Sequence, residues 1–242
     1  MVDIHCHILP DVDDGPTTWE ASTAMCRMAA ADGVQHIVAT PHANYEFEYD
    51  RAAHEERLAR LRVIAGNVVN LSLGCDFHFT YENLQGALAE PGRYCIGDTR
   101  YLLVEFSDFA IPPTTSDHLK ELVKHGITPI ITHPERNPIL QRHPGQLAEF
   151  FQLGALLQVT ANALTGRWGK VSRKMAETLL RNGRVHVLAS DAHDLRDRKP
   201  VLSEGREAAA RLVGPEAARA LVSDNPRAII SGQTIPFVPQ SA

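Results

Sequence analysis

The chain alternates short apolar segments with longer segments in which apolar residues recur at helical spacing, and this alternation is repeated seven times. The short segments are almost continuously apolar, which is typical of parallel strands that are buried on both faces. We expect strands at 2–4, 34–40, 68–73, 101–104, 127–132, 155–160 and 185–190. Seven β-then-α units predict an α/β fold, either a doubly wound sheet or a closed or distorted barrel.

The segments between the expected strands contain helix start and stop signals. Residues 17–20 resemble a capping box, and Gly33 follows the helix that they would begin. We expect helices at 21–32, 50–65, 81–89, 116–124, 146–153, 170–181 and 203–222, the last with a break near 214–215. Because no linker or low-complexity run interrupts the pattern, the sequence predicts a single domain over residues 1–242.

Imidazole and carboxylate side chains stand at the carboxyl ends of six of the seven expected strands. These residues are His5, His7, His42, Asp76, Glu105, His133, Asp191 and His193, with Asp14 in the loop after the first strand. An open sheet would spread such strand ends along a wide edge, whereas a barrel gathers them around one mouth. The distribution therefore favours a barrel with a polar site at its mouth.

The nine residues of this set offer nitrogen and oxygen ligands and no sulfur. Such a ligand set suits Mn, Fe or Zn, whereas a site made only of oxygen would suit Mg or Ca. At three or four ligands per ion, with one carboxylate bridging, the set could hold two or three ions. Clusters of this kind activate water and stabilise the charge that develops in phosphoryl transfer. The leading prediction is therefore a hydrolase.

We expect structural roles for the remaining histidines and for two aspartates of the opening loop. Asp11 and Asp13 are expected to shape the loop or to be solvated, because residues 11–15 lack the spacing and flanking helix of an EF-hand. His78 either borders the site beside Asp76 or lies outside it. The histidines expected to be structural are His36, His54, His118, His125, His143 and His186.

Composition narrows the possible partners. Hydrophobic residues make up 44% of the 242 residues and charged residues 22%, which is ordinary for a globular protein. The net charge is −5 and no Lys/Arg-rich run is present, so we expect no nucleic-acid partner. No apolar run approaches the roughly 20 residues of a membrane span, and residues 2–4 leave no room for a secretory signal. We therefore expect a cytoplasmic protein that does not insert into a membrane.

The four cysteines are scattered and form no CxxC pair, which argues against a disulfide framework or a thiolate zinc site. A thiol-based tyrosine phosphatase needs an arginine six residues after its nucleophilic cysteine. The positions six residues after Cys6, Cys26, Cys75 and Cys95 hold Val12, Asp32, Tyr81 and Tyr101. That mechanism is excluded, and we expect the cysteines to be buried thiols, with Cys6 pointing away from the site.

The motifs in combination resemble the polymerase and histidinol phosphatase (PHP) superfamily. They are His5-x-His7, Asp14, Pro41-His42, Asp76, Val104-Glu105-Phe106, Thr132-His133-Pro134-Glu135-Arg136 and Ser190-Asp191-Ala192-His193. More narrowly, residues 3–10, 13–15 and 224–226 resemble the bacterial branch of metal-dependent protein-tyrosine phosphatases from capsule and exopolysaccharide loci. The resemblance spans almost the whole chain.

The resemblance implies a distorted seven-stranded (β/α) TIM-like barrel of the PHP type with up to three metal ions, usually manganese. By family analogy His5, His7, Asp76 and Asp191 would hold one ion. Asp76, Glu105 and His133 would hold a second, and Asp14, His42 and His193 a third. Asp76 would then bridge two ions, at a position where the family usually has the longer glutamate. Fe or Zn is an alternative metal.

Two arginines match family positions that bind the phosphoryl group, Arg136 after His133 and Arg198 after His193. Their guanidinium groups suit phosphate oxygens geometrically, although a surface salt bridge is the alternative role for each. Arg167 could line the rim of the site on weaker grounds.

The resemblance implies a phosphomonoesterase that acts on phosphotyrosine in a protein. Its partner would be the tyrosine-rich tail of an autophosphorylating bacterial tyrosine kinase, with an effect on polysaccharide export. Two alternatives stay open at this point. One is the same chemistry on a small substrate such as histidinol phosphate or a nucleotide, and the other is a non-catalytic binding module with structural metals.

Overall fold

The computed structural model describes residues 1–239, so the last three residues of the predicted domain 1–242 lie outside the described residues. Nine strands in the described part form two parallel sheets. The three-stranded sheet has the order β1 (Val2–Cys6), β2 (His36–Ala39), β4 (Asn70–Leu73). The six-stranded sheet has the order β3 (His42–Ala43), β5 (Asp76–His78), β6 (Tyr101–Glu105), β7 (Thr128–Thr132), β8 (Leu156–Thr160), β9 (Val187–Ala189).

The two sheets are joined at two places, at the carboxyl end of β2 and at the outer edge of β1. The chain passes from β2 to β3 through Thr40-Pro41, and the amide of Asp76 donates to the carbonyl of Pro41 at 3.1 Å, which continues the pairing. At the outer edge, β1 and the segment after β9 form a parallel bridge between Cys6 and Ala192. Backbone hydrogen bonds of the strand type therefore connect the two sheets at both places.

The seven predicted strands are all present, but two of them are followed by short additional strands. β3 and β5 were expected only as strand ends that present His42 and Asp76. Pro41 has no N–H group to donate, which interrupts the ladder between β2 and β3. The additional strands give His42 and Asp76 a regular backbone of their own, in register with each other.

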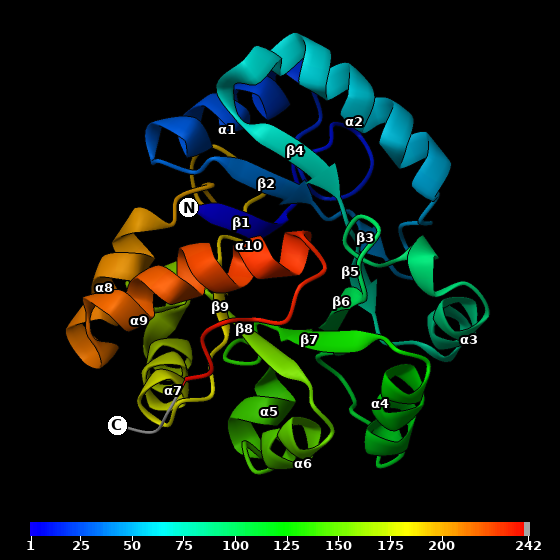
Figure 1. Cartoon of the computed structure of the whole chain (residues 1–242), viewed down its shortest axis with the longest axis vertical. Helices are drawn as coiled ribbons and strands as arrows, with labels where there is room; N and C mark the ends of the chain where they lie inside the picture. The colour runs from blue at the N-terminus through cyan, green and yellow to red at the C-terminus, as the bar shows by residue number, and fades with distance from the viewer. Residues whose placement is uncertain (240–242) are drawn as a thin grey trace.

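Ten α-helices in the described residues surround the sheets (Figure 1). Six of them start and end close to their predicted positions: α1 (Trp19–Ala31), α2 (Arg51–Ala65), α3 (Tyr81–Ala89), α4 (Thr115–Lys124), α6 (Gln146–Gln152) and α7 (Gly169–Arg181). The short α5 (Pro138–Arg142) was not predicted. None of the described helices has the length and hydropathy needed to cross a membrane.

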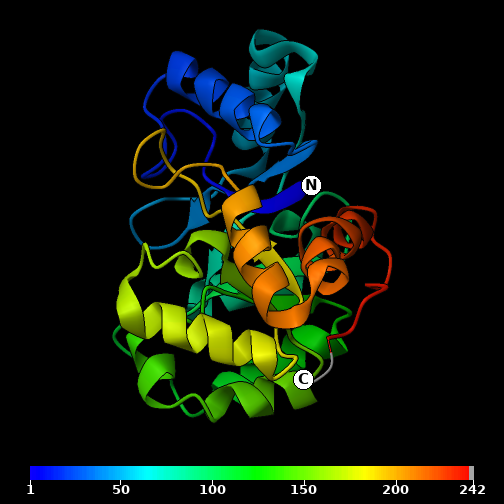
Figure 2. The ribbon, with the colours of Figure 1, turned by 90° about the vertical axis from the view of Figure 1, so that its left-hand side faces the viewer.

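The predicted helix 203–222 is divided and extends further than expected. It consists of α8 (Ser203–Val213), α9 (Pro215–Arg219), a π-helical turn (Ala220–Asp224) and α10 (Asn225–Ile230). Gly214 has a φ of 88° between α8 and α9, so the break falls where the sequence indicated it. The loops after β1 and β9 project from one side of the molecule, and α10 lies on the opposite side (Figure 2).

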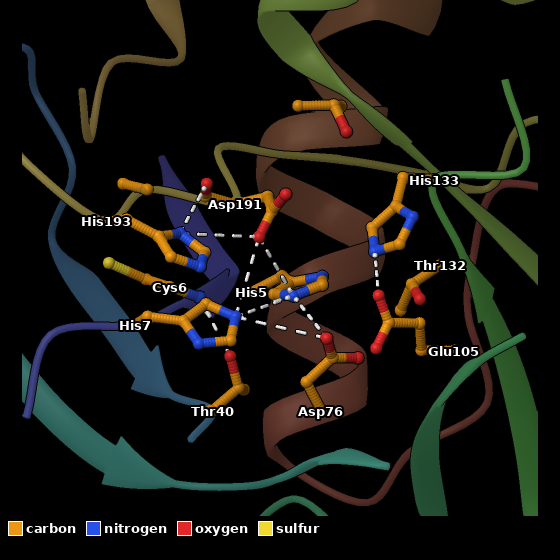
Figure 3. A network of polar contacts seen from close by, with 12 residues as sticks. His5, Cys6, His7, Thr40, Asp76, Glu105, Thr132, His133, Asp191 and His193 are labelled. Carbon is orange, nitrogen blue, oxygen red and sulfur yellow. Dashed lines mark hydrogen bonds and ion pairs between the residues drawn. The ribbon is translucent and has the colours of Figure 1, made fainter. Parts of the chain in front are cut away.

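The apolar side chains form two clusters. The smaller cluster contains Val2 and Ile4 of β1, Tyr101 and Leu103 of β6, and Ile229 of α10. The larger one lies between the strands and the surrounding helices. β1 contributes to both, since its register against β2 shifts between Asp3 and Cys6. Cys6 consequently packs in the larger cluster, and the Cys6 sulfur points away from the polar groups of the site, as predicted (Figure 3).

Candidate metal centre

The nine predicted ligands converge at the carboxyl ends of the strands. They come from β1 and the loop after it, β3, β5, the end of β6, and the segments after β7 and β9: His5, His7, Asp14, His42, Asp76, Glu105, His133, Asp191 and His193. Seven of them, all except His133 and Asp191, form three overlapping groups whose ligand atoms lie within 4.8 Å of one another. Figure 3 shows most of them from close by.

The first group is centred on the two histidines of β1 and its continuation. Nε2 of His5 lies 3.3 Å from Nε2 of His7, 3.4 Å from Oδ2 of Asp76 and 3.3 Å from Oδ1 of Asp191. Nε2 of His7 lies 3.5 Å from the same oxygen of Asp191. All four side chains are buried. They are the four residues that the family resemblance assigns to one ion.

The second group lies toward the opening loop. Oδ1 of Asp14 is 3.1 Å from Nε2 of His193 and 3.4 Å from Nε2 of His42. The ring of His7 stacks on that of His193 with 3.8 Å between centroids. His7 therefore joins this group as well as the first, which the resemblance did not imply.

The third group is centred on Glu105. Oε1 of Glu105 lies 3.6 Å from Nε2 of His133, and Oε2 lies 3.7 Å from Nδ1 of His42. The same nitrogen of His42 lies 3.3 Å from Oδ2 of Asp76. Asp76 thus stands between the first and third groups, despite having one methylene less than the usual glutamate.

The outer hydrogen bonds of His5 and His7 define their tautomers. Nδ1 of His5 donates to Oε1 of Gln158 at 2.9 Å, and Nδ1 of His7 donates to Oδ2 of Asp13 at 2.7 Å. Both Nε2 atoms then face each other at 3.3 Å, a distance at which either a proton carried by one of them or a metal ion must lie between them. Outer hydrogen bonds of this kind are the usual way in which a protein orients metal-binding imidazoles.

Other buried polar atoms in the cluster also lack partners. Neither carboxylate oxygen of Asp76 accepts a hydrogen bond from the described residues. Nδ1 of His42 and Nε2 of His193 form no hydrogen bond with these residues either. Buried polar groups are normally satisfied, and leaving them unpaired costs about 1–3 kcal/mol each. Together with the nitrogen and oxygen donor set, these orphaned atoms show that the residues fit a metal centre.

The electrostatics of the cluster favour cations. Burial alone would lower the pKa of His5, but Asp76 and Asp191 outweigh it and raise this pKa to about 9. Burial also opposes ionisation of Asp14, yet its contacts with His193 and His42 hold the pKa of the Asp14 carboxyl well below its usual range. The pKa values of Asp76 and Asp191 are lowered as well, so these three carboxylates stay ionised at neutral pH and stabilise a positive charge beside them, whether it is a proton or a metal ion. Burial and the charge of Asp76 raise the pKa of Glu105 instead.

The backbone at two of the ligands is unusual. His133 has a φ of 31° and Asp191 a φ of 50°, which are left-handed values that residues other than glycine rarely adopt. His133 follows β7 directly and Asp191 is two residues past the end of β9. Both side chains point into the cluster (Figure 3). Such strain persists where the surroundings fix it and is commonly found at functional sites.

The opening loop is held against the strand that carries the histidines. A Cβ atom on Gly15 would lie 2.7 Å from the carbonyl oxygen of His7, so no other residue fits there without a shift. Oδ1 of Asp13 accepts from the amide of Gly15 at 3.0 Å, as a loop-shaping residue would. The alternative that Asp13 is solvated is wrong, because its side chain is only 1% exposed.

Both predicted phosphate-binding arginines lie at the site. Arg136 and Arg198 donate to Oδ2 of Asp191, Arg198 at 2.7 Å. The guanidinium of Arg136 lies 3.8 Å above the ring of Trp168, and that of Arg198 lies 5.6 Å from the same ring. Nε1 of Trp168 donates to Asn162 at 2.5 Å. The sequence did not identify Trp168 as part of the site, because a single tryptophan in a loop does not by itself indicate a role there.

The structure also places the residues whose roles the sequence left open and the histidines that were expected to be structural. His78 borders the site, because its Nδ1 lies 3.3 Å from Oε2 of Glu105. Arg167 is exposed, with Nη1 3.9 Å from Asp197. Nδ1 of His186 accepts from the amide of Leu157, and Nε2 of His36 contacts Ser72, both away from the cluster.

The cysteines have no features of a nucleophile. All four are free and buried. Burial raises the pKa of Cys26 to about 12 and that of Cys95 to about 11. Burial also raises the pKa values of Cys6 and Cys75 well above the ordinary value of a thiol. A thiolate, which is the reactive form, is therefore disfavoured at each position.

Comparison with known proteins agrees with this geometry. A family described as capsular polysaccharide synthesis, CpsB/CapC, matches residues 1–231. The tyrosine-protein phosphatase CpsB of Streptococcus pneumoniae is 32% identical over 97% of this chain and 100% of its own length. A crystal structure from work on YwqE of Bacillus subtilis and CpsB of S. pneumoniae, described as metal-dependent tyrosine phosphatases, has a TM-score of 0.91 and 31% identity, covering 100% of this chain and 99% of that one.

More distant likeness concerns the fold alone. Dihydropyrimidinase from Brevibacillus agri NCHU1002 is 11% identical with a TM-score of 0.57, covering 100% of this chain and 73% of that one. The nearer matches confirm the predicted resemblance to the capsule branch of metal-dependent phosphatases, and they extend over almost the entire sequence. The chain belongs to the CpsB/CapC family of capsular polysaccharide synthesis.

Proposed function

We propose that this protein is a metal-dependent tyrosine-protein phosphatase, a phosphoric monoester hydrolase. The observation that carries the proposal is the pair of Nε2 atoms of His5 and His7, which face each other at 3.3 Å among buried carboxylates while both Nδ1 atoms are hydrogen-bonded to outer partners. The relatives that are named tyrosine-protein phosphatases match this chain from end to end, which supports the same activity here.

The proposal includes up to three metal ions, most simply Mn²⁺, with Fe or Zn as alternatives. His5, His7, Asp76 and Asp191 would hold the first, Asp76, Glu105 and His133 the second, and Asp14, His42 and His193 the third. Ions in such a cluster supply an activated water and stabilise the charge that develops on a transferring phosphoryl group. The overlapping groups of ligand atoms support the sharing of Asp76 and the grouping of Asp14, His42 and His193. The contacts of Asp191 with His5 and of His133 with Glu105 support the other two memberships.

Arg136 and Arg198 are proposed to bind the phosphoryl oxygens of the substrate. Asp191 and the face of Trp168 restrain both guanidinium groups, so little side-chain freedom remains to be lost when phosphate binds. Each guanidinium has further N–H donors beyond those that Asp191 accepts, and these are available for oxygens of the substrate.

The leaving phenolate needs a proton, and His78 is the candidate donor. Its side chain is one-fifth exposed, and its Nδ1 lies against Glu105, at the border between the cluster and solvent. A histidine in this position can exchange protons with water and deliver one to the leaving oxygen.

The finer features of the architecture and the setting are proposed as well. We propose that residues 1–242 form a single domain whose two sheets close as a distorted seven-stranded (β/α) barrel, with β2/β3 and β4/β5 each acting as one bent strand. The hydrogen bonds from His7 and Asp191 across the β1–β9 edge support closure.

Four free buried thiols fit a reducing compartment, which supports a cytoplasmic location.

The proposed substrate is a phosphotyrosine protein, and the tyrosine-rich tail of a bacterial tyrosine kinase is the proposed physiological partner. The family's description as capsular polysaccharide synthesis supports this link.

A two-substrate assay tests the proposed function. The manganese-loaded protein is assayed for phosphate release from a phosphotyrosine peptide and from histidinol phosphate at equal concentrations. We expect a kcat/KM that is much greater for the peptide. Preferential turnover of histidinol phosphate would instead identify a small-molecule phosphatase, and stoichiometric metal without hydrolysis of either ester would identify a binding module.

A further inference from the structure

The exposed aromatic side chains of the described residues are concentrated at one part of the site's mouth. Tyr45, Tyr81 and Phe109 are 91%, 67% and 94% exposed, and the other large apolar side chains with high exposure are all aliphatic. Tyr45 and Phe109 lie on the loops that leave β3 and β6, and Tyr81 begins α3 shortly after β5; these three strands are neighbours in the six-stranded sheet. We call these three residues the aromatic rim.

The aromatic rim is connected to the metal ligands by short stretches of ordered chain. Its three strands carry His42, Asp76 and Glu105. Phe47, which follows Tyr45 by two residues, stacks on His42 with 6.1 Å between ring centroids and 12° between the planes. A substrate that reaches the cluster therefore passes beside these loops.

The three loops are also tied to one another. Nδ2 of Asn83, in the first turn of α3, donates to the carbonyl of Ala43 at 2.7 Å. The amide of Phe79 donates to the carbonyl of Glu105 at 2.9 Å, and its ring packs edge-on against Phe106. The exposed aromatic side chains thus project from anchored backbone, so they can bind a partner without first ordering a loop.

The surface beside Tyr45 is hollowed. A cavity of about 380 Å³ is lined by residues 43–49 together with Asn83, Arg93 and Tyr94. Arg93 takes part in the wall of this cavity, where its guanidinium donates to the carbonyl of Tyr49 at 3.2 Å and lies over the ring of Tyr94.

The charge of these loops differs from that of the segments after β7 and β9. Segments 44–50, 79–82 and 106–114 contain no lysine or arginine, and Glu46, Glu48, Glu82 and Asp108 are exposed there. In the segments after β7 and β9, Arg136 and Arg198 are directed at Asp191. The mouth therefore has a cationic side beside the proposed phosphate site and an acidic, aromatic side formed by the three loops.

We propose that the aromatic rim and its neighbouring carboxylates bind the polypeptide that flanks the phosphotyrosine, and that they prefer segments with apolar and basic residues. This inference rests on the proposed function and deepens it by naming the substrate class. Apolar side chains of the peptide pack on Tyr45, Tyr81 and Phe109, while a lysine or arginine pairs with the exposed carboxylates. Exposed aromatic anchors with complementary charge are typical of protein-binding surfaces.

The occupant must be a chain rather than a small ester. The rim residues stand on three separate loops, and histidinol phosphate or a nucleotide has no atoms that could cover them while its phosphate lies at the metal cluster. A peptide that continues past its phosphotyrosine has such atoms. The rim would thereby distinguish a protein phosphatase from a small-molecule phosphatase with the same metal chemistry.

Kinetics on matched substrates test this inference. The manganese-loaded protein is assayed with phenyl phosphate, with a phosphotyrosine peptide flanked by lysine and leucine, and with the same peptide flanked by aspartate and glycine. The double variant Tyr45→Ala/Phe109→Ala is expected to lower the ratio of kcat/KM on the lysine peptide to that on phenyl phosphate about tenfold, through KM. Glu46→Gln/Glu48→Gln is expected to reduce the preference for the lysine peptide over the aspartate peptide.

Val63→Ala provides the matched control, because Val63 is an exposed apolar residue in the last turn of α2. This variant should leave both ratios at the values of the unchanged protein, and melting temperatures should show that all variants fold. If the unchanged protein hydrolyses the peptides but the rim variants leave both ratios unaltered, the rim inference is wrong while the proposed function stands. If the unchanged protein hydrolyses phenyl phosphate but neither peptide, both are wrong.

Discussion

At the scale of single residues, the decisive feature is where the hydrogens of two imidazoles lie. Gln158 and Asp13 each accept the Nδ1 hydrogen of a histidine, from His5 and His7 respectively, and this leaves both Nε2 atoms free to bind a cation. Outer partners of this kind hold a ring in its metal-binding tautomer and commonly contribute 10–100-fold to metal affinity or activity. Asp13 therefore acts on the site through His7.

Replacing Asp13 by asparagine tests this role. The amide of Asp13→Asn can donate to Nδ1 of His7, which would move the ring hydrogen to Nε2 and remove a metal-binding lone pair. We expect about 10–100-fold weaker metal binding or activity, measured by elemental analysis and by nitrogen NMR of the His7 ring. The control is Asp11→Asn, because Asp11 is exposed on the same loop. Equal behaviour of the two variants would contradict the role of Asp13.

A second residue-scale prediction concerns stability and pH. Burial, with a smaller effect of Arg184, lowers the pKa of His186 to about 4, whereas an unfolded chain has a value near 6.5. Between these two values the unfolded state binds more protons, so stability falls as the pH falls from about 6.5 toward 4. The loss attributable to this residue is about 3 kcal/mol at most.

Urea unfolding at several pH values measures that loss. His186→Gln retains a side-chain oxygen that can accept from the amide of Leu157 but does not titrate. The variant should lose less stability than the unchanged protein between pH 6.5 and pH 5, while other titrating groups act equally in both. Identical pH slopes would show that His186 is not held neutral by the fold.

At the scale of elements, periodicity predicted the fold where the chain is regular. Helix bounds such as those of α1 and α2 could be predicted because the apolar spacing agrees there with a capping side chain at the start and a glycine after the end. The short strands β3 and β5 could not be predicted, because a two- or three-residue strand depends on pairing with distant segments rather than on its own sequence. α5 was missed for a similar reason, although the side chain of Asn137 caps it.

The convergence of the candidate ligands could be predicted from the sequence because all of them except Asp14 stand at or just after a strand end, and parallel strands bring their ends together. The residues that support them could not be predicted. Asp13 and Gln158 become visible as partners only once the loop and β8 are packed beside the histidines, and Trp168 only once its loop lies under Arg136. Contacts between a site residue and the residue that supports it depend on tertiary packing, which the local sequence does not reveal.

A glycine in α8 gives an element-scale prediction. A Cβ atom at Gly205 would lie 2.5 Å from the carbonyl oxygen of Ala161, which is in the turn directly after β8. Helix propensity alone would make Gly205→Ala stabilising by about 1 kcal/mol. We expect it instead to destabilise the protein by about 1–3 kcal/mol, because α8 must move away from that turn.

Chemical denaturation provides the measurement for Gly205→Ala. The companion variant Ala210→Gly in the same helix should cost about 1 kcal/mol through propensity. If Gly205→Ala raised the free energy of unfolding, the close approach of α8 to the β8 turn would not constrain the fold.

At the scale of the whole molecule, the metal centre joins the two sheets. His5 comes from the three-stranded sheet, while His42, Asp76 and Glu105 come from the six-stranded sheet. An ion held by residues of both would stabilise the native state over the unfolded state by mass action. We therefore expect metal binding to increase the folding stability of this protein as well as to support its catalysis.

The central claim is that these nine side chains hold the metal on which phosphotyrosine hydrolysis depends. The most direct measurement starts from chelated protein, shown by elemental analysis to lack metal, and follows its activity on a phosphotyrosine peptide together with its melting temperature as Mn²⁺ is added. We predict that the metal-free protein is inactive and that activity and melting temperature rise together with bound manganese. Full activity of the metal-free protein would contradict the claim.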